Sequence, residues 1–295
     1  MEQKCSLCPR KCGATRTEKI SGGLCRSLFL PAVARAAPHF GEEPCIAGEK
    51  GTGAVFFTGC NLMCVFCQNR DISRGQGGKV LSVPELRDTI LRLRDMGPDS
   101  IDLVTGTHFI PAIAEALSGL ELGIPVVWNS SGYESIEGLK MLEGLVDVYM
   151  PDFKYFDPAM AKRYSMAEDY PKVAAAAIKE MYRQVGPYRL DERGIMRRGM
   201  IIRHLILPGG KFNAMDVIDF IAEEFPEDSV LFSLMSQYTP PAEGLEDYPE
   251  LQRRVDHDTN SRLIAYMQKR GLSGYWQELE SATEELLPDW DLTGV

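Results

Sequence analysis

Short apolar runs alternate with longer amphipathic segments along this chain from residue 53 onward. Apolar runs of about four to eight residues predict buried strands, and apolar positions that recur at the helical repeat predict helices. We expect six strands, at residues 54–58, 101–104, 125–129, 146–150, 200–207 and 230–234. We expect helices at residues 83–96, 110–120, 136–142, 158–186 with a break near Pro171, and 213–224, followed by a charged helical tail beyond Pro241.

Strands and helices that alternate at this spacing indicate parallel βα units and an α/β fold. Six such units make either an open, doubly wound sheet or a partial barrel, and the periodicity does not distinguish the two. In both architectures the loops at the carboxyl ends of the strands carry the chemistry. We therefore look for functional residues directly after each predicted strand.

The overall composition narrows the class of protein. With 295 residues and 44% hydrophobic content, the chain can bury a large core, and its net charge is −10. It has no run of about 18 apolar residues, so the sequence predicts no membrane span. The N-terminus lacks an apolar signal region, which favours a cytoplasmic location. Eight cysteines in a reducing compartment are typical of metal ligands rather than disulfides.

Charge is distributed unevenly along the chain. Residues 1–35 carry seven Lys or Arg against two acids, a net charge of +5, which leaves −15 on the remainder. An acidic body argues against general affinity for nucleic acid. The basic head could hold an anionic cluster, a phosphorylated ligand or a partner protein, or it could simply be a solvated surface.

The loop after the first predicted strand carries Cys60, Cys64 and Cys67 with the spacing C-x3-C-x2-C. Three thiolates on one loop can bind three irons of a cubane [4Fe–4S] cluster, and they leave the fourth iron without a protein ligand. A structural zinc site needs four ligands, usually in two pairs, and no His or further Cys follows closely enough to complete one here. The spacing therefore predicts a cluster with one open iron, on which an exchangeable ligand binds.

A second group of cysteines lies near the N-terminus. Cys5, Cys8, Cys12 and Cys25 fall within a glycine-containing stretch that has no long hydrophobic pattern, which predicts a small metal-stabilised module. Four thiolates are compatible with zinc and with a second iron–sulfur cluster, and the alternative is that they bind nothing. Cys45 lies outside the pattern and is expected to be a buried or loop cysteine, although it could replace Cys25 as the fourth ligand.

The cluster loop resembles that of a known family. C-x3-C-x2-C with Phe66 before the last cysteine resembles the cluster loop of the radical S-adenosylmethionine (SAM) enzymes. The segment FFTGCNLMCVFCQN resembles the branch related to pyruvate formate-lyase activating enzymes, with an additional N-terminal Cys-rich module. The resemblance extends from about residue 5 to residue 240, and it implies a partial (β/α)6 TIM-like barrel at residues 46–240. Residues 1–45 would then be a metal-binding head, and residues 241–295 a helical extension.

The resemblance also implies a reaction. SAM would bind the open iron of the [4Fe–4S] cluster. An electron from a low-potential donor, ferredoxin or flavodoxin, would cleave SAM to methionine and a 5′-deoxyadenosyl radical that takes a hydrogen atom from the substrate. The cofactor performs the difficult chemistry, and the protein binds, orients and shields it. Cys60, Cys64 and Cys67 are the residues that this chemistry needs first.

Polar segments at the predicted strand ends are candidates for binding SAM. Thr105, Gly106 and Thr107 stand where relatives carry a Gly-Gly-Glu type segment that meets the SAM ammonium. Here His108 occupies the place of the acid. Asn129 ends the third strand, and it and the two serines after it can hydrogen-bond to ribose or carboxylate. The alternatives are an ordinary loop for the first segment and a helix cap for the second.

Asp152 and Lys154 match the Asp-x-Lys found at the fourth strand of pyruvate formate-lyase activating enzymes. The acid could accept hydrogen bonds from ribose or amine donors, and the lysine could hold the SAM carboxylate as a point charge. Alternate residues of an extended segment point to the same side, so both can face the barrel mouth. The alternative interpretation is an ion pair at a strand end.

His204 lies on an apolar predicted strand, where a lone histidine is usually a satisfied core residue. Its segment resembles the R-H-x-x-x-P-G stretch of the family, whose histidine contacts SAM, and this favours a contact with the cofactor. Further residues at strand ends are candidates for lining the substrate space, or else ordinary core residues: Met150, Phe153, Tyr155, Met235, Gln237 and Tyr238.

Three functions are compatible with the sequence. The first is an oxidoreductase that works anaerobically and installs a glycyl radical on a partner enzyme. The second is a radical SAM enzyme that modifies a small molecule or peptide, and a shared fold cannot choose between these two. The third is a non-catalytic iron–sulfur or zinc protein for electron transfer or nucleic-acid binding. The chain has no Ser–His–Asp order, phosphate-binding loop or His-Glu-x-x-His motif that would indicate hydrolysis or phosphoryl transfer.

Overall fold

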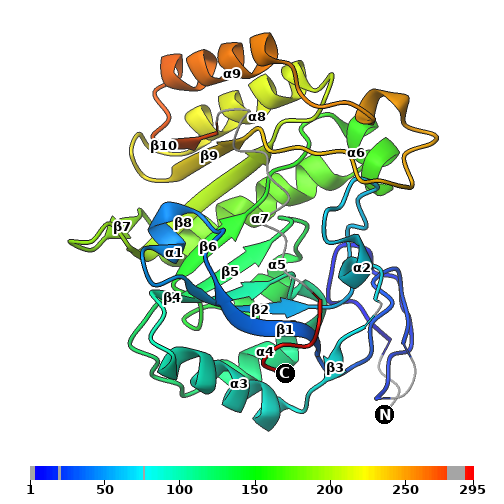
Figure 1. Cartoon of the computed structure of the whole chain (residues 1–295), viewed down its shortest axis with the longest axis vertical. Helices are drawn as coiled ribbons and strands as arrows, with labels where there is room; N and C mark the ends of the chain where they lie inside the picture. The colour runs from blue at the N-terminus through cyan, green and yellow to red at the C-terminus, as the bar shows by residue number, and fades with distance from the viewer. Residues whose placement is uncertain (1–3, 19–20, 76, 278–289) are drawn as a thin grey trace.

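The computed structural model of this chain describes residues 4–18, 21–75, 77–277 and 290–295. In these residues ten strands form one sheet in the order β10-β9-β8-β6-β5-β4-β2-β1-β3, and β7 pairs with β8 beside this path (Figure 1). The strands are β1 (Ala32–His39), β2 (Thr52–Phe57), β3 (Lys79–Val80), β4 (Ser100–Val104), β5 (Val126–Ser130), β6 (Val148–Pro151), β7 (Arg189–Leu190), β8 (Met196–Leu205), β9 (Leu231–Met235) and β10 (Gly274–Trp276).

The strands β2, β4, β5, β6, β8, β9 and β10 run parallel to one another. The first six of them correspond to the six predicted strands, which confirms an α/β fold built on a parallel sheet. In the described residues the strand order does not join β10 to β3, so the sheet is open at that side. This arrangement is consistent with the expected partial barrel.

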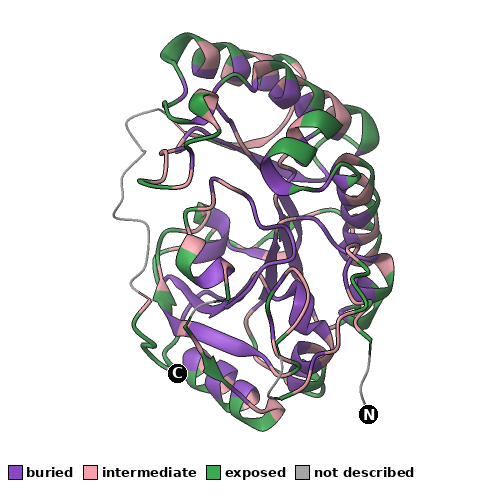
Figure 2. Ribbon diagram, turned by 90° about the vertical axis from the view of Figure 1, so that its right-hand side faces the viewer, coloured by how far each residue is buried: buried purple, intermediate pink, exposed green. Residues whose placement is uncertain are grey.

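Helices cover the outside of the sheet (Figure 1), with α3 packed against α4, α4 against α5, α5 against α7, and α8 against α9. Their outward faces are exposed and their inward faces are buried (Figure 2). The helices are α1 (Pro44–Ala47), α2 (Arg70–Ser73), α3 (Val83–Asp95), α4 (Ile110–Leu117), α5 (Ile136–Met141), α6 (Pro158–Ser165), α7 (Tyr170–Val185), α8 (Lys211–Glu224) and α9 (His257–Lys269), with 3-10 turns at Thr107–Phe109 and Pro249–Leu251. The predicted helices are confirmed, and the expected break near Pro171 falls between α6 and α7.

The start of α3 shows how local sequence positions a helix. Ser82 Oγ accepts a hydrogen bond from the Glu85 backbone N–H at 3.4 Å, and the Glu85 carboxylate accepts one from the Ser82 N–H at 2.8 Å. This reciprocal capping box satisfies two donors that a helix start leaves free. Leu86, Ile90 and Leu93 are fully buried on one face. Burial of each such side chain contributes about 1.5–3 kcal/mol, which fixes this face against the sheet.

Side chains that alternate along the parallel strands divide the barrel interior into layers. Ile46 of α1 packs with Val127, Val148 and Ile201 in a buried apolar cluster. Cys45 belongs to the same cluster and is buried, as expected from the sequence. In Figure 1, α1 lies at the end of the sheet opposite to α2. This apolar cluster, which we call the apolar plug, therefore closes the amino ends of the strands. The carboxyl ends are left free for the site.

The strand β1 was not predicted from the sequence, and it lies within residues 1–45, which were assigned to the head. It pairs antiparallel with β2 on one side and with β3 on the other. Residues 290–295 return to the same strand, because the Ala36 N–H donates to the Thr293 carbonyl oxygen at 2.9 Å. Trp290 packs edge-on against Phe56, with ring centroids 5.3 Å apart. The division into three domains stays a prediction.

The region beyond Pro241 is only partly helical. The helix α9 lies there, but β10 joins the sheet as a strand parallel to β9. Gly274 begins this strand with φ of 142°, and a Cβ there would lie 2.7 Å from the Phe232 backbone nitrogen. Glycine therefore allows the close approach that turns this part of the tail into a strand. Residues 278–289 of the predicted tail lie outside the described residues. Among the helices that are described, none has the length and apolar character needed to cross a membrane.

Candidate active site

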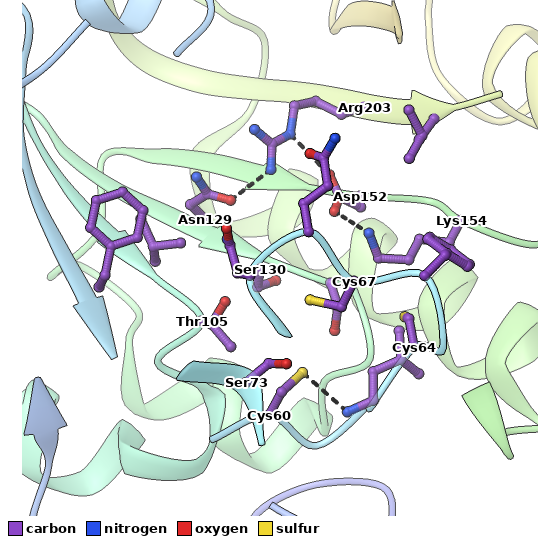
Figure 3. A pocket seen from close by; sticks show the side chains of 18 of the residues that line it. Cys60, Cys64, Cys67, Ser73, Thr105, Asn129, Ser130, Asp152, Lys154 and Arg203 are labelled. Atoms are coloured by element: carbon purple, nitrogen blue, oxygen red, sulfur yellow. Dashed lines mark hydrogen bonds and ion pairs between the residues drawn. The ribbon is translucent and has the colours of Figure 1, made fainter. Parts of the chain in front are cut away.

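The loop after β2 brings the three predicted cluster cysteines to one pocket at the carboxyl ends of the strands (Figure 3). Cys60 and Cys64 are buried, and Cys67 is partly exposed. The loop begins with Gly59, whose φ is 82°. A Cβ at Gly59 would lie 2.5 Å from the carbonyl oxygen of Cys25, in the Cys-rich head. The loop therefore needs glycine where it passes the head.

The rest of the pocket lining comes from the cluster loop itself, from the ends of β1, β2, β4, β5, β6, β8 and β9, from the loop before α1, and from α2. Five of the predicted cofactor-binding residues line it: Phe66, Thr105, Asn129, Asp152 and Lys154. It is also lined by two serines and by two residues predicted for the substrate space: Ser130, Ser131, Met235 and Gln237. Figure 3 shows the labelled side chains of this wall around the same opening as the three cysteines. The fold thus assembles polar groups that lie far apart in the sequence.

Arg203 of β8 connects the acids of this wall. Its Nε donates to Asp152 Oδ1 at 2.9 Å. Its two terminal nitrogens donate to Glu42 Oε2 at 3.0 Å and to Asn129 Oδ1 at 2.7 Å. Lys154 Nζ pairs with the second oxygen of Asp152, Oδ2, at 2.5 Å. The guanidinium therefore links β5, the end of β6, β8 and the loop between β1 and α1 at one point of the pocket.

This ion-pair network keeps its members charged. Burial alone would raise the pKa of the Asp152 carboxyl, but Arg203 and then Lys154 outweigh burial and lower it. Burial alone would lower the pKa of Lys154, but Asp152 and then Cys64 outweigh it and raise that pKa. The pKa of Arg203 is also raised, because Asp152 and Glu42 outweigh the effect of burial. Fixed charges of both signs therefore face the pocket at neutral pH.

Two carboxyl groups, Glu42 in this wall and Asp102 behind it, share one amide. Asn129 Nδ2 donates to Glu42 Oε1 at 3.1 Å and to Asp102 Oδ2 at 3.2 Å. Burial, followed by the neighbouring Glu42, raises the pKa of Asp102 well above its usual range. Asp102 Oδ1 has no hydrogen-bond partner among the described residues. Burial and a like charge both favour the protonated acid, so Asp102 adds little negative charge behind the pocket.

The predicted segment after β4 contributes only Thr105 to the pocket lining. Thr105 has a positive φ of 62°, which is uncommon outside glycine. Thr107 instead donates from Oγ1 to Glu134 Oε1 at 2.8 Å, and burial raises the pKa of this carboxyl. A Cβ at Gly106 would lie 2.8 Å from the Trp128 ring, so the glycine permits tight packing of the turn. The roles predicted for Gly106 and Thr107 in cofactor binding stay predictions.

His204 and His108 are buried and do not line the pocket. His204 Nδ1 lies 2.7 Å from the Phe153 carbonyl oxygen, and burial lowers the pKa of its imidazole to about 4. Burial lowers the pKa of His108 to about 3. Side chains alternate along β8, so Arg203 faces the pocket and its neighbour His204 does not. The predicted contact of His204 with SAM stays a prediction.

Aromatic side chains surround Phe66 beside the cluster loop. Its ring centroid lies 6.4 Å from those of Tyr155 and Tyr164 and 6.1 Å from that of Tyr238, all in edge-to-face contact. Such contacts hold rings more firmly than burial alone. Four candidates for the substrate space are buried and do not line the pocket: Met150, Phe153, Tyr155 and Tyr238. The aromatic cluster therefore excludes water from one side of the loop.

Two of the three loop cysteines accept a hydrogen bond. The donors are the Leu62 N–H on Cys60 Sγ (3.4 Å) and the Ser165 hydroxyl on Cys64 Sγ (3.1 Å). The Ser73 hydroxyl beside Cys67 donates to the Arg70 carbonyl oxygen at 3.1 Å. Burial raises the pKa of the Cys60 thiol to about 12. A metal that binds here therefore displaces protons, and the thiolates formed meet donors already in place.

Comparisons with known proteins agree with this geometry. A family profile described as the Radical SAM superfamily matches residues 54–187. An uncharacterized protein of Methanocaldococcus jannaschii is 31% identical to this chain over 285 residues, which cover 92% of this chain and 76% of that protein. The chain belongs to the radical SAM superfamily. The matched residues of this radical SAM protein include the cluster loop and the polar ends of β4, β5 and β6.

Two solved structures also match part of this radical SAM chain. SuiB of Streptococcus suis matches with 15% identity and a TM-score of 0.49, over 80% of this chain and 50% of SuiB. A radical SAM methyltransferase from Sphaerobacter thermophilus matches with 14% identity and a TM-score of 0.48, over 79% of this chain and 69% of that one. The aligned part of the chain thus spans half the length of SuiB.

Membership of the radical SAM superfamily implies a [4Fe–4S] cluster and SAM, and the donor groups of the pocket fit both. The three thiols open on it, two of them with hydrogen-bond donors in place, and thiolates are the usual ligands of iron–sulfur clusters. The wall supplies a cation at Lys154, an anion at Asp152 and an amide at Asn129. These groups match the carboxylate, ammonium and hydroxyl groups of SAM.

The cysteines predicted for a second metal site lie near one another in the head. Burial raises the pKa of the Cys8 thiol to about 11, and Cys25, Cys5 and Cys12 add to the effect. Two short hairpins carry them, closed by pairing of residues 4 with 15 and 22 with 27. Within the described part of the chain, neither these cysteines nor those of the cluster loop form a group of three or more His, Cys, Asp or Glu arranged to hold a metal ion. The second metal site stays a prediction.

Three residues of the site were not singled out from the sequence: Glu42, Ser165 and Arg203. Arg203 lies next to His204, which was considered instead, because an apolar strand buried on both faces does not show which of two neighbours points toward the site. Glu42 lies in a loop whose acids gave no pattern. Ser165 lies 101 positions from Cys64, and nothing in the sequence near either residue indicates their contact.

Proposed function

We propose that this radical SAM protein cleaves SAM reductively and uses the product to abstract a hydrogen atom from a substrate. The observation that carries the proposal is that Cys60, Cys64 and Cys67 open on the same pocket as the charged pair Asp152 and Lys154. When bound, the reduced cluster supplies the electron that splits SAM into methionine and a 5′-deoxyadenosyl radical.

The residues of the chain bind, orient and shield. Lys154 is charged and lines the pocket, so it suits the carboxylate of SAM as a point charge. The Asp152 carboxylate and Asn129 Oδ1 have further lone pairs that can accept hydrogen bonds from the ammonium and ribose hydroxyls. Arg203 holds Asp152 ionised and in place. The rings packed around Phe66 keep water from the reaction space.

Anaerobic reconstitution tests this proposal. The full-length protein is loaded with iron and sulfide, incubated with SAM and dithionite, and analysed for 5′-deoxyadenosine and methionine. Wild type should form both products, and Cys64→Ala should form neither. Cys45→Ala is the matched control, because Cys45 is a buried cysteine of the apolar plug and should leave product formation unchanged. A loaded wild type that does not cleave SAM would show that the protein is a non-catalytic iron–sulfur protein.

A narrower proposal concerns the substrate. The resemblance of the cluster loop and of Asp152 and Lys154 to pyruvate formate-lyase activating enzymes supports a glycyl-radical partner enzyme. The test uses pyruvate formate-lyase as the probe and records the glycyl radical by electron paramagnetic resonance (EPR). A glycyl signal that depends on SAM and on Cys64 supports the activator. SAM cleavage without that signal, in the presence of the probe, favours a small molecule or peptide as substrate.

The electron donor and the head metal are proposed on the same basis. Reduced flavodoxin or ferredoxin should replace dithionite in the cleavage assay, because radical SAM chemistry needs a low-potential donor. The proximity of Cys5, Cys8, Cys12 and Cys25 supports a second metal site, either zinc or an iron–sulfur cluster. Counting iron, sulfide and zinc per chain in wild type and in Cys8→Ala decides between the two metals. Equal counts in both proteins would exclude the site.

A further inference from the structure

Ser165, the last residue of α6, donates a hydrogen bond from Oγ to Cys64 Sγ at 3.1 Å. The serine is fully buried, and the cysteine is 7% exposed. Cys64 is one of the three thiols that line the pocket. A hydroxyl from a distant helix therefore acts directly on a proposed cluster ligand.

Tyr155 is the second partner of the Ser165 hydroxyl, and it also interacts with Cys64. Its hydroxyl lies 2.7 Å from Ser165 Oγ, and its side chain is fully buried. A hydroxyl has one hydrogen to donate. Because Ser165 gives its hydrogen to the sulfur, Tyr155 must supply the hydrogen between the two oxygens. The Tyr155 hydroxyl therefore donates a hydrogen bond to Ser165, and the Ser165 hydroxyl donates one to Cys64.

The backbone around Ser165 is bonded to the cluster loop and to the head. The Val65 N–H donates to the carbonyl oxygen of Tyr164 at 2.9 Å. A terminal nitrogen of Arg10 donates to the carbonyl oxygen of Ser165 itself at 2.7 Å. The next residue, Met166, ends α6 with a left-handed backbone, φ 51°. These contacts fix the position from which the hydroxyl reaches the sulfur.

A donor at this sulfur changes the electron affinity of the cluster. Reduction adds negative charge, part of which resides on the thiolate ligands. A hydrogen bond stabilises the more negative state, so it raises the reduction potential. Burial strengthens the effect, because a low local dielectric screens it less.

We propose that Ser165, oriented by Tyr155, is a positioning residue that raises the reduction potential of the cluster bound through Cys64. The inference rests on the proposed function only in that the three loop cysteines hold the cluster. Its consequence is that the cluster accepts an electron from a weaker reductant than it would without the serine.

The midpoint potential of the cluster tests this inference, measured on the reconstituted full-length protein by a redox titration followed by EPR. Ser165→Ala should shift the potential to more negative values, with iron and sulfide content equal to wild type. Tyr155→Phe leaves the serine hydroxyl without its orienting donor and should give a smaller shift in the same direction. Ser165→Thr keeps the hydroxyl and should restore the wild-type potential.

Ser229→Ala is the matched control, since it removes a buried hydroxyl whose one partner among the described residues is the Pro226 carbonyl oxygen, and its midpoint potential should equal that of wild type. If the cluster-loaded Ser165→Ala and Tyr155→Phe proteins both have the midpoint potential of wild type, the inference is overturned. If Ser165→Ala does not bind a cluster, the comparison is made between the other two variants. The inference is then overturned if Tyr155→Phe and Ser165→Thr have the same midpoint potential. A wild type that binds no cluster overturns this inference and the proposed function together, whereas a wild type that cleaves SAM while the variants show no shift overturns the inference alone.

Discussion

Arg10 Nε donates a hydrogen bond to the carbonyl oxygen of Asn61 at 2.9 Å, which ties the Cys-rich head to the cluster loop. The same guanidinium donates to the carbonyl oxygens of Leu62 at 3.2 Å and Ser165 at 2.7 Å. It also lies over the Tyr133 ring, 5.2 Å from its centroid. A planar guanidinium can serve several carbonyl groups at once in a way that an ammonium cannot. The head therefore braces the loop, whatever metal it binds.

Replacing Arg10 by lysine should loosen the cluster loop. A hydrogen bond to a charged group contributes about 1.5–3 kcal/mol when buried, and these bonds are partly buried, so we expect a net loss of about 1–3 kcal/mol. The loaded Arg10→Lys protein should release iron to a chelator several-fold faster than wild type. Lys4→Ala, which removes an exposed charge from the same head, is the control. Equal release rates for Arg10→Lys and wild type would show that the brace has no effect.

Removing Arg203 should leave Glu42 without its cation and Asp152 with Lys154 as its one remaining cation among the described residues. Breaking a buried ion pair on one side typically costs about 3–5 kcal/mol, because the remaining charge is buried and unpaired. Urea denaturation of Arg203→Met should show a loss of this size. Adding Glu42→Gln to the same protein removes the charge that has lost its cation and should recover part of the loss. A double variant that is less stable than Arg203→Met would contradict this account of the network.

Lys154→Met should weaken SAM binding without loss of the cluster. If the lysine holds the SAM carboxylate, its loss removes a charged hydrogen bond and should raise the KM for SAM by about 10- to 100-fold. Iron content should stay at the wild-type value. Lys162→Met removes an exposed lysine, 67% accessible and paired with Glu168, and serves as the control. An unchanged KM would mean that Lys154 is only the partner of Asp152 in an ion pair at a strand end.

His204 should make stability depend on pH. Its folded pKa of about 4 lies below the usual value of 6.5, so the unfolded chain takes up the proton first as the pH falls. The stabilisation is complete above about pH 6.5 and is lost as the pH falls from there toward 4, at about 1.4 kcal/mol per pH unit. The difference in unfolding free energy between wild type and His204→Gln should therefore shrink by about 2 kcal/mol between pH 7 and pH 5. A constant difference would mean that the histidine does not titrate as a buried neutral group.

The parallel strands could be predicted because each is a short apolar run that ends at polar or glycine residues. The strand β1 could not, since its sequence AVARAAPH is rich in alanine, which has low preference for strands, and contains Pro38. Its conformation comes from pairing with β2 and β3 on either side. Pairing with these strands outweighs the low strand preference of the β1 residues, and the local sequence of β1 does not reveal this pairing.

The residues of the candidate site also fall into two groups, those that the local sequence predicts and those that only the folded structure brings to the site. Cys60, Cys64 and Cys67 were found because their ligand spacing is local. Arg203 was passed over because an apolar strand buried on both faces gives no alternation that would show which neighbour points inward. Ser165 is joined to Cys64 only by the packing of α6 against the cluster loop, and such contacts have no signal in a single sequence.

The final residues of the chain have a consequence for how the protein is made. Phe56 belongs to the pocket wall, and Trp290 supports its ring from behind. Asp291 pairs with Arg35 of β1 at 3.0 Å. Residues up to Asp291 must therefore be synthesised before this part of the wall gains its support. A chain cut before Trp290 would lose that support, although the cut removes none of the described residues that line the pocket.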